Sequence, residues 1–577
     1  MVTMRELQNY KSEPSQRAGE EWGVMMSRCS NYMDWVDTVI RRPLQGSWKG
    51  RDADAAQDRL GRLGQNFQYA AQQTSLIRTA LDGVATALAA ERRKLIEALE
   101  EAESRKYTVH DDGTVEYTAE GTDDPHAGGN TGPDPNIHWA QEIQDHITQA
   151  VKRATEIDQE YASTLNRLQT GRGLTIDDRM WLDAARDSKA VRKAAGDDLG
   201  LDSIPKKGTK PKDVNSWWRG LSHEEQQEYQ ALYPGQIGAL DGIPSDVRDE
   251  ANRGRLRQSH ADAQMKLNQH LQEEPDKWIA IDASVRKPNP EWEEWDEKRK
   301  SLQGLSDGTN AIQSNLDKGG EKGLPEGYLL GFDDEGIGRA IVARGNPDTA
   351  DHTAVYVPGT KTNLPTIGGD LDRSDALWRE SSRLSDGQSV STVTWLGYEA
   401  PQEISGDAME SEKANEGGPL LNQFVDGTRA THDGDSPSHT TLVGHSYGSV
   451  VIGSAARQGD VHADDIVVAG SPGMQVSRAS ELDVDKGHVW NETGTDDWVP
   501  EGGSLTPHAP REWRWWGEYD AVTPDSDLFG ANQMETDTSG HGDYWNYNDE
   551  AQTDPSESLR NQARVIVGDY DKVSRDD

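Results

Sequence analysis

The feature that most constrains this chain is a glycine-flanked serine between an apolar run and a helix-like run. Thr440-Thr441-Leu442-Val443 leads into Gly444-His445-Ser446-Tyr447-Gly448, and Ser449-Val450-Val451-Ile452 follows. In a G-x-S-x-G turn from strand to helix the glycines are needed because a Cβ would clash with nearby backbone. A plain Gly/Ser turn is the alternative in a chain with 57 glycines. The flanking runs favour a nucleophile turn centred on Ser446.

A serine nucleophile needs a histidine base and a carboxylate that orients the histidine. In α/β-hydrolases the chain order is serine, acid, histidine. The histidines after Ser446 are His462, His488, His508 and His541. His541 is the best candidate, because it lies in a glycine-flanked loop ahead of a predicted C-terminal helix.

The acid is expected in the loop after the predicted strand at 488–491. This loop reads Gly494-Thr495-Asp496-Asp497-Trp498-Val499. Asp497 is favoured because Asp-x-Val resembles the pattern common after this strand in the superfamily, and Asp496 remains the alternative acid. A solvated turn position is the other interpretation of either residue.

The developing oxyanion requires two N–H donors. One is expected from Tyr447, the residue after the nucleophile. The second is expected from Gly359 or Thr360, which follow the apolar run at 353–357. A simple strand-ending Pro-Gly turn is the alternative explanation for this segment.

A tryptophan-rich stretch lies between the predicted acid and His541. Trp513, Trp515 and Trp516 are predicted to wall or cover a pocket for an apolar acyl group, with packing of a surface excursion as the alternative. No cofactor or metal is expected. The acidic stretch at 370–375 lacks the complete calcium-loop pattern, and a single cysteine, Cys29, excludes an intrachain disulfide and a Cys-based zinc cluster.

From Gly327 onwards, short apolar runs alternate with helix-like or loop segments. This alternation predicts an α/β fold with a mainly parallel sheet and flanking helices. The predicted strands include residues 328–330, 340–342, 353–357, 390–395, 440–443 and 466–469.

The first hundred residues predict two long helices joined by a turn. Apolar residues recur at helical spacing from Trp22 to Ile40, and again from Leu60 to Leu88 with heptad steps. The turn carries Trp48-Lys49-Gly50, so the pair resembles the WXG-type hairpins associated with type VII secretion; an ordinary helical hairpin is the alternative. Tyr107 to Asp111 fits a Tyr-x-x-x-Asp secretion signal, but the residues that follow favour a β-hairpin turn.

These patterns predict four regions along the chain. They are a WXG-like helical hairpin at 1–110, an acidic Gly/Pro linker at 111–137, a helical region at 138–325 and an α/β-hydrolase catalytic domain at 326–577. Self-association, or a helical-hairpin partner, is expected through residues 20–100.

The net charge of −41 argues against binding to nucleic acid or to anionic membranes, because both require a basic face. No apolar run has the length of a signal sequence or a membrane span. The sequence therefore predicts a cytoplasmic protein, or one exported without a cleaved signal in a type VII-like way.

Four segments together carry a family resemblance. Val357-Pro358-Gly359-Thr360, Trp395-Leu396-Gly397-Tyr398, Gly444 to Gly448 and Ala469 to Gly473 resemble the actinobacterial α/β-hydrolase domain of unknown function, over about residues 214–570. The resemblance implies the fold and a serine hydrolase site, without a settled substrate.

The expected function is hydrolysis of an ester, thioester or amide, with a small-molecule or lipid-like acyl substrate. The alternative is a type VII-secretion-related effector or interaction protein, in which the hydrolase domain is a payload or an inactive scaffold.

Overall fold

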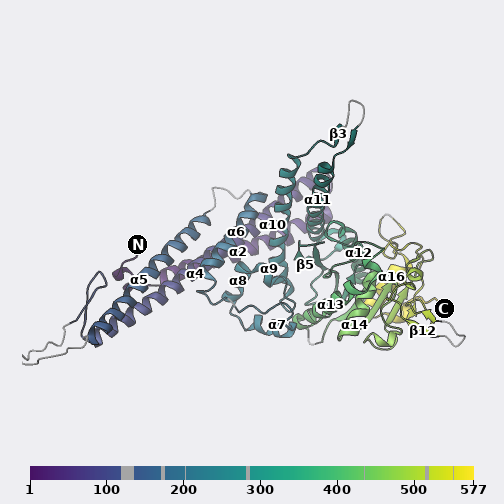
Figure 1. The fold of residues 1–577 in the computed structure, drawn as a ribbon. Helices are drawn as coiled ribbons and strands as arrows, with labels where there is room; N and C mark the ends of the chain where they lie inside the picture. Colours follow the sequence, from purple (N-terminus) through teal and green to yellow (C-terminus); the bar gives the residue numbers. More distant parts are fainter. Residues whose placement is uncertain are drawn as a thin grey trace, which may run out of the picture. The chain divides into compact units, whose positions relative to one another are not determined.

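The computed structural model describes residues 1–117, 135–169, 176–201, 203–280, 286–434, 436–513, 519–549 and 551–576. They form two units. Met1–Arg41, Ala55–Ile204 and His223–Tyr233 make up the first unit, and Arg42–Asp54, Pro205–Ser222 and Pro234–Asp577 make up the second (Figure 1). Most of the predicted linker lies outside the described residues, at 118–134.

The first unit is built around two antiparallel helices, α2 (Glu13–Trp35) and α4 (Arg51–Ser104). Gly19 of α2 lies against Asp82 of α4, and thirteen residues later Tyr32 packs on Phe67 at a ring-centroid distance of 5.5 Å. Along the chain, a π-helical turn (Val36–Arg41) and then α3 (Arg42–Ser47), which belongs to the second unit, come between these two helices. The helices predicted on both sides of Trp48-Lys49-Gly50 are therefore present.

The remaining helices of this unit are α1 (Met4–Gln8), α5 (Pro135–Arg167), α6 (Asp178–Ala195) and α8 (His223–Leu232). α5 packs on α4 through fully buried side chains, among them Leu95, Ile143 and Ile147. Short strands β1 (Thr108–Val109) and β2 (Val115–Glu116) pair antiparallel. The stretch after Tyr107 is thus a β-hairpin, as the turn residues predicted.

The second unit contains an eight-stranded sheet in the order β14-β11-β10-β9-β7-β8-β6-β5. The six strands from β14 to β8 are parallel, and β6 and β5 add antiparallel pairs at one edge, so the mainly parallel sheet predicted from the sequence is present. The strands are β5 (Gly327–Asp333), β6 (Arg339–Arg344), β7 (His352–Val357), β8 (Val390–Leu396), β9 (His439–His445), β10 (Asp465–Ala469), β11 (Val489–Glu492) and β14 (Asn532–Gln533).

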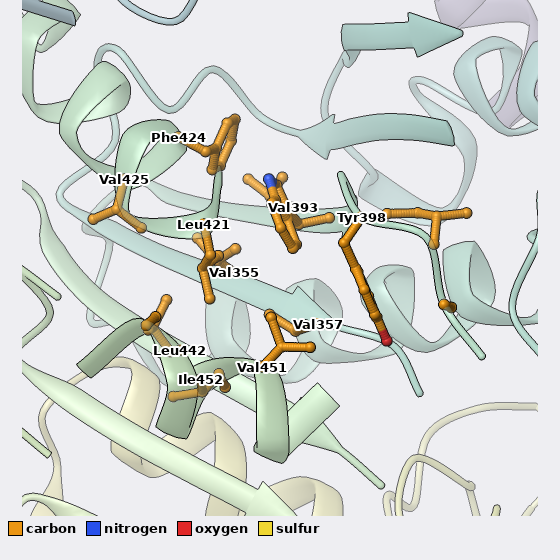
Figure 2. Packing of buried hydrophobic residues seen from close by; sticks show 14 of the residues in the cluster. Val355, Val357, Val393, Tyr398, Leu421, Phe424, Val425, Leu442, Val451 and Ile452 are labelled. Carbon is orange, nitrogen blue, oxygen red and sulfur yellow. The ribbon is translucent and has the colours of Figure 1, made fainter. Parts of the chain in front are cut away.

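Helices cover both faces of this sheet. Alternate residues of its central strands point to opposite faces, so each face carries side chains that pack against helices. Val355 and Val357 of β7 pack with residues of α13 (Glu412–Thr431) and α14 (Tyr447–Gln458), as Figure 2 shows. Ala354 and Tyr356 face the other way, into a second cluster with α12 (Gly368–Leu384) and α16 (Glu557–Ile566). The central strands are therefore buried on both sides.

Further helices extend this unit before the sheet begins. They are α7 (Pro211–Gly220), α9 (Pro234–Ile237), α10 (Ser245–Leu271) and α11 (Pro290–Asp317), and β3 (Trp278–Ala280) pairs with β4 (Arg286–Pro288) between the last two. Asn252 of α10 donates to the carbonyl oxygen of Leu329 in β5 at 3.0 Å, so α10 is tied to the sheet edge. Later in the chain, α15 (Val499–Gly503) precedes the antiparallel pair β12 (Arg511–Trp513) and β13 (Tyr519–Ala521).

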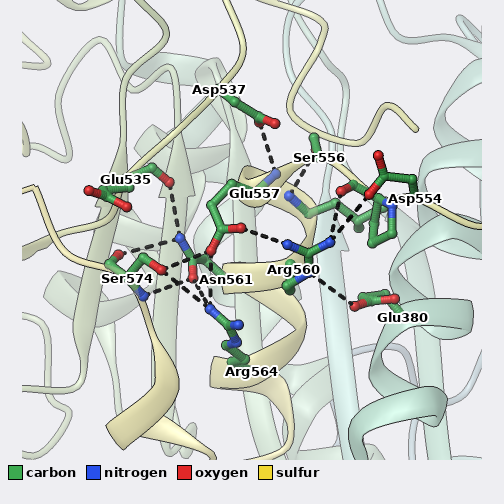
Figure 3. A network of polar contacts seen from close by, with 12 residues as sticks. Glu380, Glu535, Asp537, Asp554, Ser556, Glu557, Arg560, Asn561, Arg564 and Ser574 are labelled. Carbon is green, nitrogen blue, oxygen red and sulfur yellow. Dashed lines mark hydrogen bonds and ion pairs between the residues drawn. The ribbon is translucent and has the colours of Figure 1, made fainter. Parts of the chain in front are cut away.

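A polar network fixes α16 against the end of the sheet (Figure 3). The main-chain N–H of Glu557 donates to Asp537, which follows β14, and Asn561 donates to the carbonyl oxygen of Glu535. Arg564 and Ser574 both contact the Glu557 carboxylate. The loop at 538–549 is thereby held between two anchored segments.

Candidate active site

Ser446 occupies a strained turn between β9 and α14. Its backbone has φ 53° and ψ −126°, a conformation that L-residues rarely adopt. A Cβ at Gly444 would lie 2.9 Å from the Cα of Ser449, and one at Gly448 would lie 2.0 Å from the carbonyl oxygen of Val357. Both flanking glycines are therefore required by close backbone approach.

The neighbouring strand β10 ends beside this turn. His445 is in register with Ala469, and the N–H of Ser446 donates to the carbonyl oxygen of Ala469 at 3.1 Å. The next residue, Gly470, has φ +59°. A Cβ there would lie 2.5 Å from Oδ2 of Asp497 and 2.8 Å from Nδ1 of His541. Gly470 therefore provides the space for an aspartate and a histidine one strand away from Ser446.

Asp497 and His541 are in direct contact. Nδ1 of His541 lies 2.9 Å from Oδ1 and 2.8 Å from Oδ2 of Asp497. Main-chain hydrogen bonds also join their loops, from Thr495 to Thr538 and from Asp496 to Ser539. Because the contact uses Nδ1, it leaves Nε2 of His541 for another partner.

Three donors keep the buried Asp497 carboxylate ionised. Burial alone would raise its pKa, but hydrogen bonds from His541, from the Tyr544 hydroxyl (2.6 Å) and from the N–H of Val499 (3.0 Å) outweigh burial and lower the pKa below the ordinary value. Tyr544 in turn accepts the N–H of Gly494 at 2.9 Å. Sequence reasoning missed Tyr544; its place three residues after His541 was the available signal.

His445, immediately before Ser446, supports the His541 loop. Its Nε2 lies 2.8 Å from the carbonyl oxygen of His541, and the two rings are 4.7 Å apart. Burial, together with the charges of Arg373 and His541, lowers the His445 pKa well below its ordinary value, so the ring is neutral. A neutral ring with the proton on Nε2 donates to that carbonyl oxygen. This role was not foreseen from the sequence.

Gly359 lies directly against the Ser446 turn. A Cβ on Gly359 would be 2.8 Å from the Cβ of Ser446 and 3.1 Å from the backbone nitrogen of Tyr447. The carbonyl oxygen of Pro358 accepts a hydrogen bond from the Tyr398 hydroxyl at 2.8 Å, which holds the turn in place. Thr360 follows and is half-buried. Gly359 and Tyr447, two of the three residues predicted to donate to an oxyanion, are thus adjacent to the predicted nucleophile.

The other candidate residues are placed elsewhere. Asp496 is exposed, and among the described residues its side chain forms no hydrogen bond. His462 pairs with Asp426, and His488 pairs with Asp465. His508 is fully buried against residues 408–411. Of the described histidines after Ser446, His541 is the one whose ring contacts Asp497.

One expected contact is not formed. In the described residues, no hydrogen bond joins the Ser446 hydroxyl to the His541 ring. The two residues are close because the His541 ring lies against Gly470, and because His445, next to Ser446, contacts the carbonyl oxygen of His541. Such contacts often tighten only when substrate binds.

The predicted pocket residues are only partly described. Trp513 lies on β12 with its side chain exposed. Trp515 and Trp516 lie outside the described residues, so their role as pocket walls stays a prediction.

Comparison with known proteins supports the fold of the second unit. Residues 333–507 match the family described as alpha/beta hydrolase. With this match and the sheet described above, the C-terminal part of the chain is an α/β-hydrolase domain. The match supports a hydrolase function.

Similar proteins are known from mycobacteria. The chain is 31% identical over 322 residues to the uncharacterized protein Rv2079 of Mycobacterium tuberculosis, covering 52% of this chain and 46% of that protein. It is 34% identical over 177 residues to the uncharacterized protein Rv0963c of the same species, covering 29% of this chain and 65% of that protein. The chain therefore spans about half the length of the first of these relatives.

A solved structure is also similar, that of MGS-M1, an alpha/beta hydrolase enzyme from a Medee basin deep-sea metagenome library. The identity is 15%, the coverage is 30% of this chain and 70% of that chain, and the TM-score is 0.19.

Neither a metal cluster nor a membrane-spanning helix is found in the part of the chain that the structure describes. No three His, Cys, Asp or Glu side chains in those ranges are grouped so as to hold a metal ion. No helix there has the length and apolar character needed to cross a membrane.

We predict that Gly448→Ala destabilises the second unit by about 1–3 kcal/mol, because the added methyl overlaps the carbonyl oxygen of Val357. Urea denaturation followed by tryptophan fluorescence measures the change. Gly369→Ala in α12 is the control, since a Cβ there meets no atom within 4 Å, and we expect it to be neutral or slightly stabilising. Equal stability of the two variants would contradict the close approach at Gly448.

Proposed function

We propose that the α/β-hydrolase domain is a serine hydrolase that cleaves an ester, thioester or amide through an acyl-enzyme. Ser446 is the nucleophile, His541 the general base and Asp497 the residue that orients His541. The observation that carries the proposal is the contact of His541 Nδ1 with both oxygens of Asp497, beside Gly470 and one strand away from Ser446.

The Asp497–His541 contact and the close approach of Gly359 to the Ser446 turn support this chemistry. Asp497 accepts from Nδ1 of His541, so the lone pair of Nε2 takes the proton of Ser446 as Oγ attacks the carbonyl carbon. The N–H of Tyr447 and that of Gly359 or Thr360 stabilise the oxyanion. His541 then returns the proton to the leaving group, and water, activated by the same histidine, releases the acid and regenerates Ser446.

The positive φ of Ser446 serves the same chemistry. In this turn the serine side chain stands at the end of the sheet, ahead of the first turn of α14. The partial positive charge of the helix N-terminus stabilises negative charge that develops there. The strain at Ser446 is thus part of the proposed catalytic design.

We predict that a fluorophosphonate probe labels the wild-type protein at Ser446 and does not label Ser446→Ala. The probe reacts with serines that have an activated hydroxyl, so labelling reports the nucleophile without knowledge of the substrate. Intact-protein mass spectrometry measures the adduct, and circular dichroism controls for folding. A folded wild type that remains unlabelled would exclude the proposed chemistry.

We predict that Asp497→Asn lowers kcat roughly 10³–10⁴-fold on a p-nitrophenyl ester, because the amide no longer stabilises the correct tautomer and the imidazolium form of His541. Asp496→Asn is the matched control, since its exposed side chain has no contact with His541, and we expect a change of less than about twofold. A larger loss in Asp496→Asn than in Asp497→Asn would assign the acid to the other residue.

A second candidate function, as an interaction or type VII-secretion-related protein, is favoured by one flank of α2. The apolar residues at 25, 32, 35 and 39 follow one another at helical spacing on α2 and the adjoining turn, and all are exposed. Trp48, in the turn before α4, is exposed as well. We propose that this α2 flank binds a second copy of the chain or a helical-hairpin partner, because a continuous exposed apolar stripe is typical of an interaction surface.

We predict that Met25→Glu/Trp35→Glu converts a dimer to a monomer in size-exclusion chromatography with light scattering, because the new charges would be buried in the interface. The control is Met265→Glu/Trp278→Glu. The two methionines are each 44% exposed and the two tryptophans are 51% and 49% exposed, but the control pair lies outside the α2 flank. A wild-type monomer would exclude self-association. The secretion hypothesis is tested by export of the protein from an actinobacterial host: equal export of the wild type and of Trp48→Ala would count against secretion through the hairpin.

A further inference from the structure

The exposed apolar side chains of the α/β-hydrolase domain lie in segments that follow strands at one end of the sheet. Among the described residues from 286 to 576, the exposed large apolar side chains are Ile404, Met409, Trp498, Leu505 and Trp513. The first two follow β8 and the others follow β11. The strands on either side of β9 are β7 and β10, and β8 and β11 run parallel to them. The segments that follow β8 and β11 therefore leave the sheet at its carboxyl end, where Ser446 follows β9.

Two of these segments are joined next to the nucleophile turn. Nε2 of His508 lies 2.9 Å from the carbonyl oxygen of Ala408, and its Nδ1 lies 3.1 Å from Oγ of Ser411. The Tyr447 hydroxyl donates to the carbonyl oxygen of Glu410 at 2.7 Å. We call the apolar residues at 404, 409, 498 and 505 the apolar rim. These contacts hold in place the segment that carries Met409 and the residue three positions after Leu505.

The rim also adjoins the predicted oxyanion turn. The N–H of Lys361 donates to the carbonyl oxygen of Pro401 at 2.7 Å, and Nε2 of Gln402 donates to the carbonyl oxygen of Thr362 at 3.0 Å. On the other side, Trp498 directly follows Asp497. Ile404 thus lies two residues after a segment that contacts the residues following the predicted oxyanion turn, and Trp498 lies next to the acid of the Asp497–His541 pair.

The charge around the rim limits what can cover it. The exposed charged residues of the same segments are Glu399, Glu403, Asp407, Glu410, Asp496 and Glu501 against Lys361 and Arg511. An anionic lipid surface would be repelled by this excess of carboxylates, whereas an uncharged apolar phase would gain from removing the rim from water.

We propose that the apolar rim binds the surface of an aggregated, uncharged acyl ester and delivers the ester to Ser446. This inference rests on the proposed function and names its substrate class. Oγ of Ser446 bonds to the acyl carbon, the ester C–O bond breaks, and the alcohol leaves with the proton held by His541. Water then adds to the acyl carbon, and its proton passes through His541 to Ser446 as the carboxylic acid departs.

The test compares hydrolysis of tributyrin below and above its solubility limit, followed by acid release at constant pH. We expect the wild-type rate to rise at least fivefold when droplets form. In Met409→Gln/Leu505→Gln the ratio of the droplet rate to the dissolved rate should fall at least fivefold. Met265→Gln/Leu271→Gln is the matched control, because it changes exposed residues of the same types on α10, and its ratio should equal that of the wild type.

A second measurement does not depend on turnover. Ser446→Ala protein is mixed with triolein droplets and the droplets are recovered by flotation; we expect the protein to float with them, and the added Met409→Gln/Leu505→Gln change to leave it in solution. Stronger recovery on droplets coated with phosphatidylglycerol would overturn the uncharged substrate class.

The outcomes separate the two proposals. Hydrolysis of dissolved tributyrin with no rise at the solubility limit, or an equal loss of the ratio in the control variant, would overturn the rim as a binding surface and leave the serine hydrolase intact. A wild type that neither hydrolyses dissolved ester nor reacts with fluorophosphonate would overturn both.

Discussion

The site depends on the close approach of backbone at the ends of β7, β9 and β10. The carbonyl oxygen of Val357 lies where a side chain on Gly448 would have to be, and Gly359 rests on the Cβ of Ser446. These contacts hold Ser446 at φ 53°, which costs on the order of 1–3 kcal/mol and persists only because the surrounding backbone leaves no alternative. The buried strands on both sides of β9 supply the rigidity for this geometry.

The Asp497–His541 pair illustrates how an ionised group is kept inside a protein. Burial of the carboxylate is unfavourable, and it is offset by donors from three positions, His541, Tyr544 and Val499. Two contacts hold the His541 loop in place. His445 binds the carbonyl oxygen of His541, and the N-terminal turn of α16 binds Asp537. The polar network of α16 anchors the segments on either side of this loop.

Much of the fold and part of the site could be predicted from sequence. The strands of the sheet were evident as short apolar runs, because a parallel strand buried on both faces needs continuous apolar residues. The serine turn was evident because its glycines are fixed by sterics. Tyr544, His445 and Gly470 were not recognised as parts of the site, since their contribution depends on contacts between segments up to about a hundred residues apart that no local spacing encodes. The region boundaries, and the association of the helical hairpin with secretion, stay predictions.

By itself the sequence determined the local elements: a strand that turns sharply into a helix at Ser446, acidic residues and histidines further along the chain, and two long N-terminal helices. It left Asp496 and Asp497 as alternatives, because adjacent residues in one loop satisfy the same pattern. Only the tertiary structure decided which carboxylate lies against His541, since that depends on the register between β10 and β11 and on the space above Gly470. It also decided that the exposed apolar residues at 404–409 and 498–505 lie at the same end of the sheet, because the loops that follow parallel strands all leave at that end.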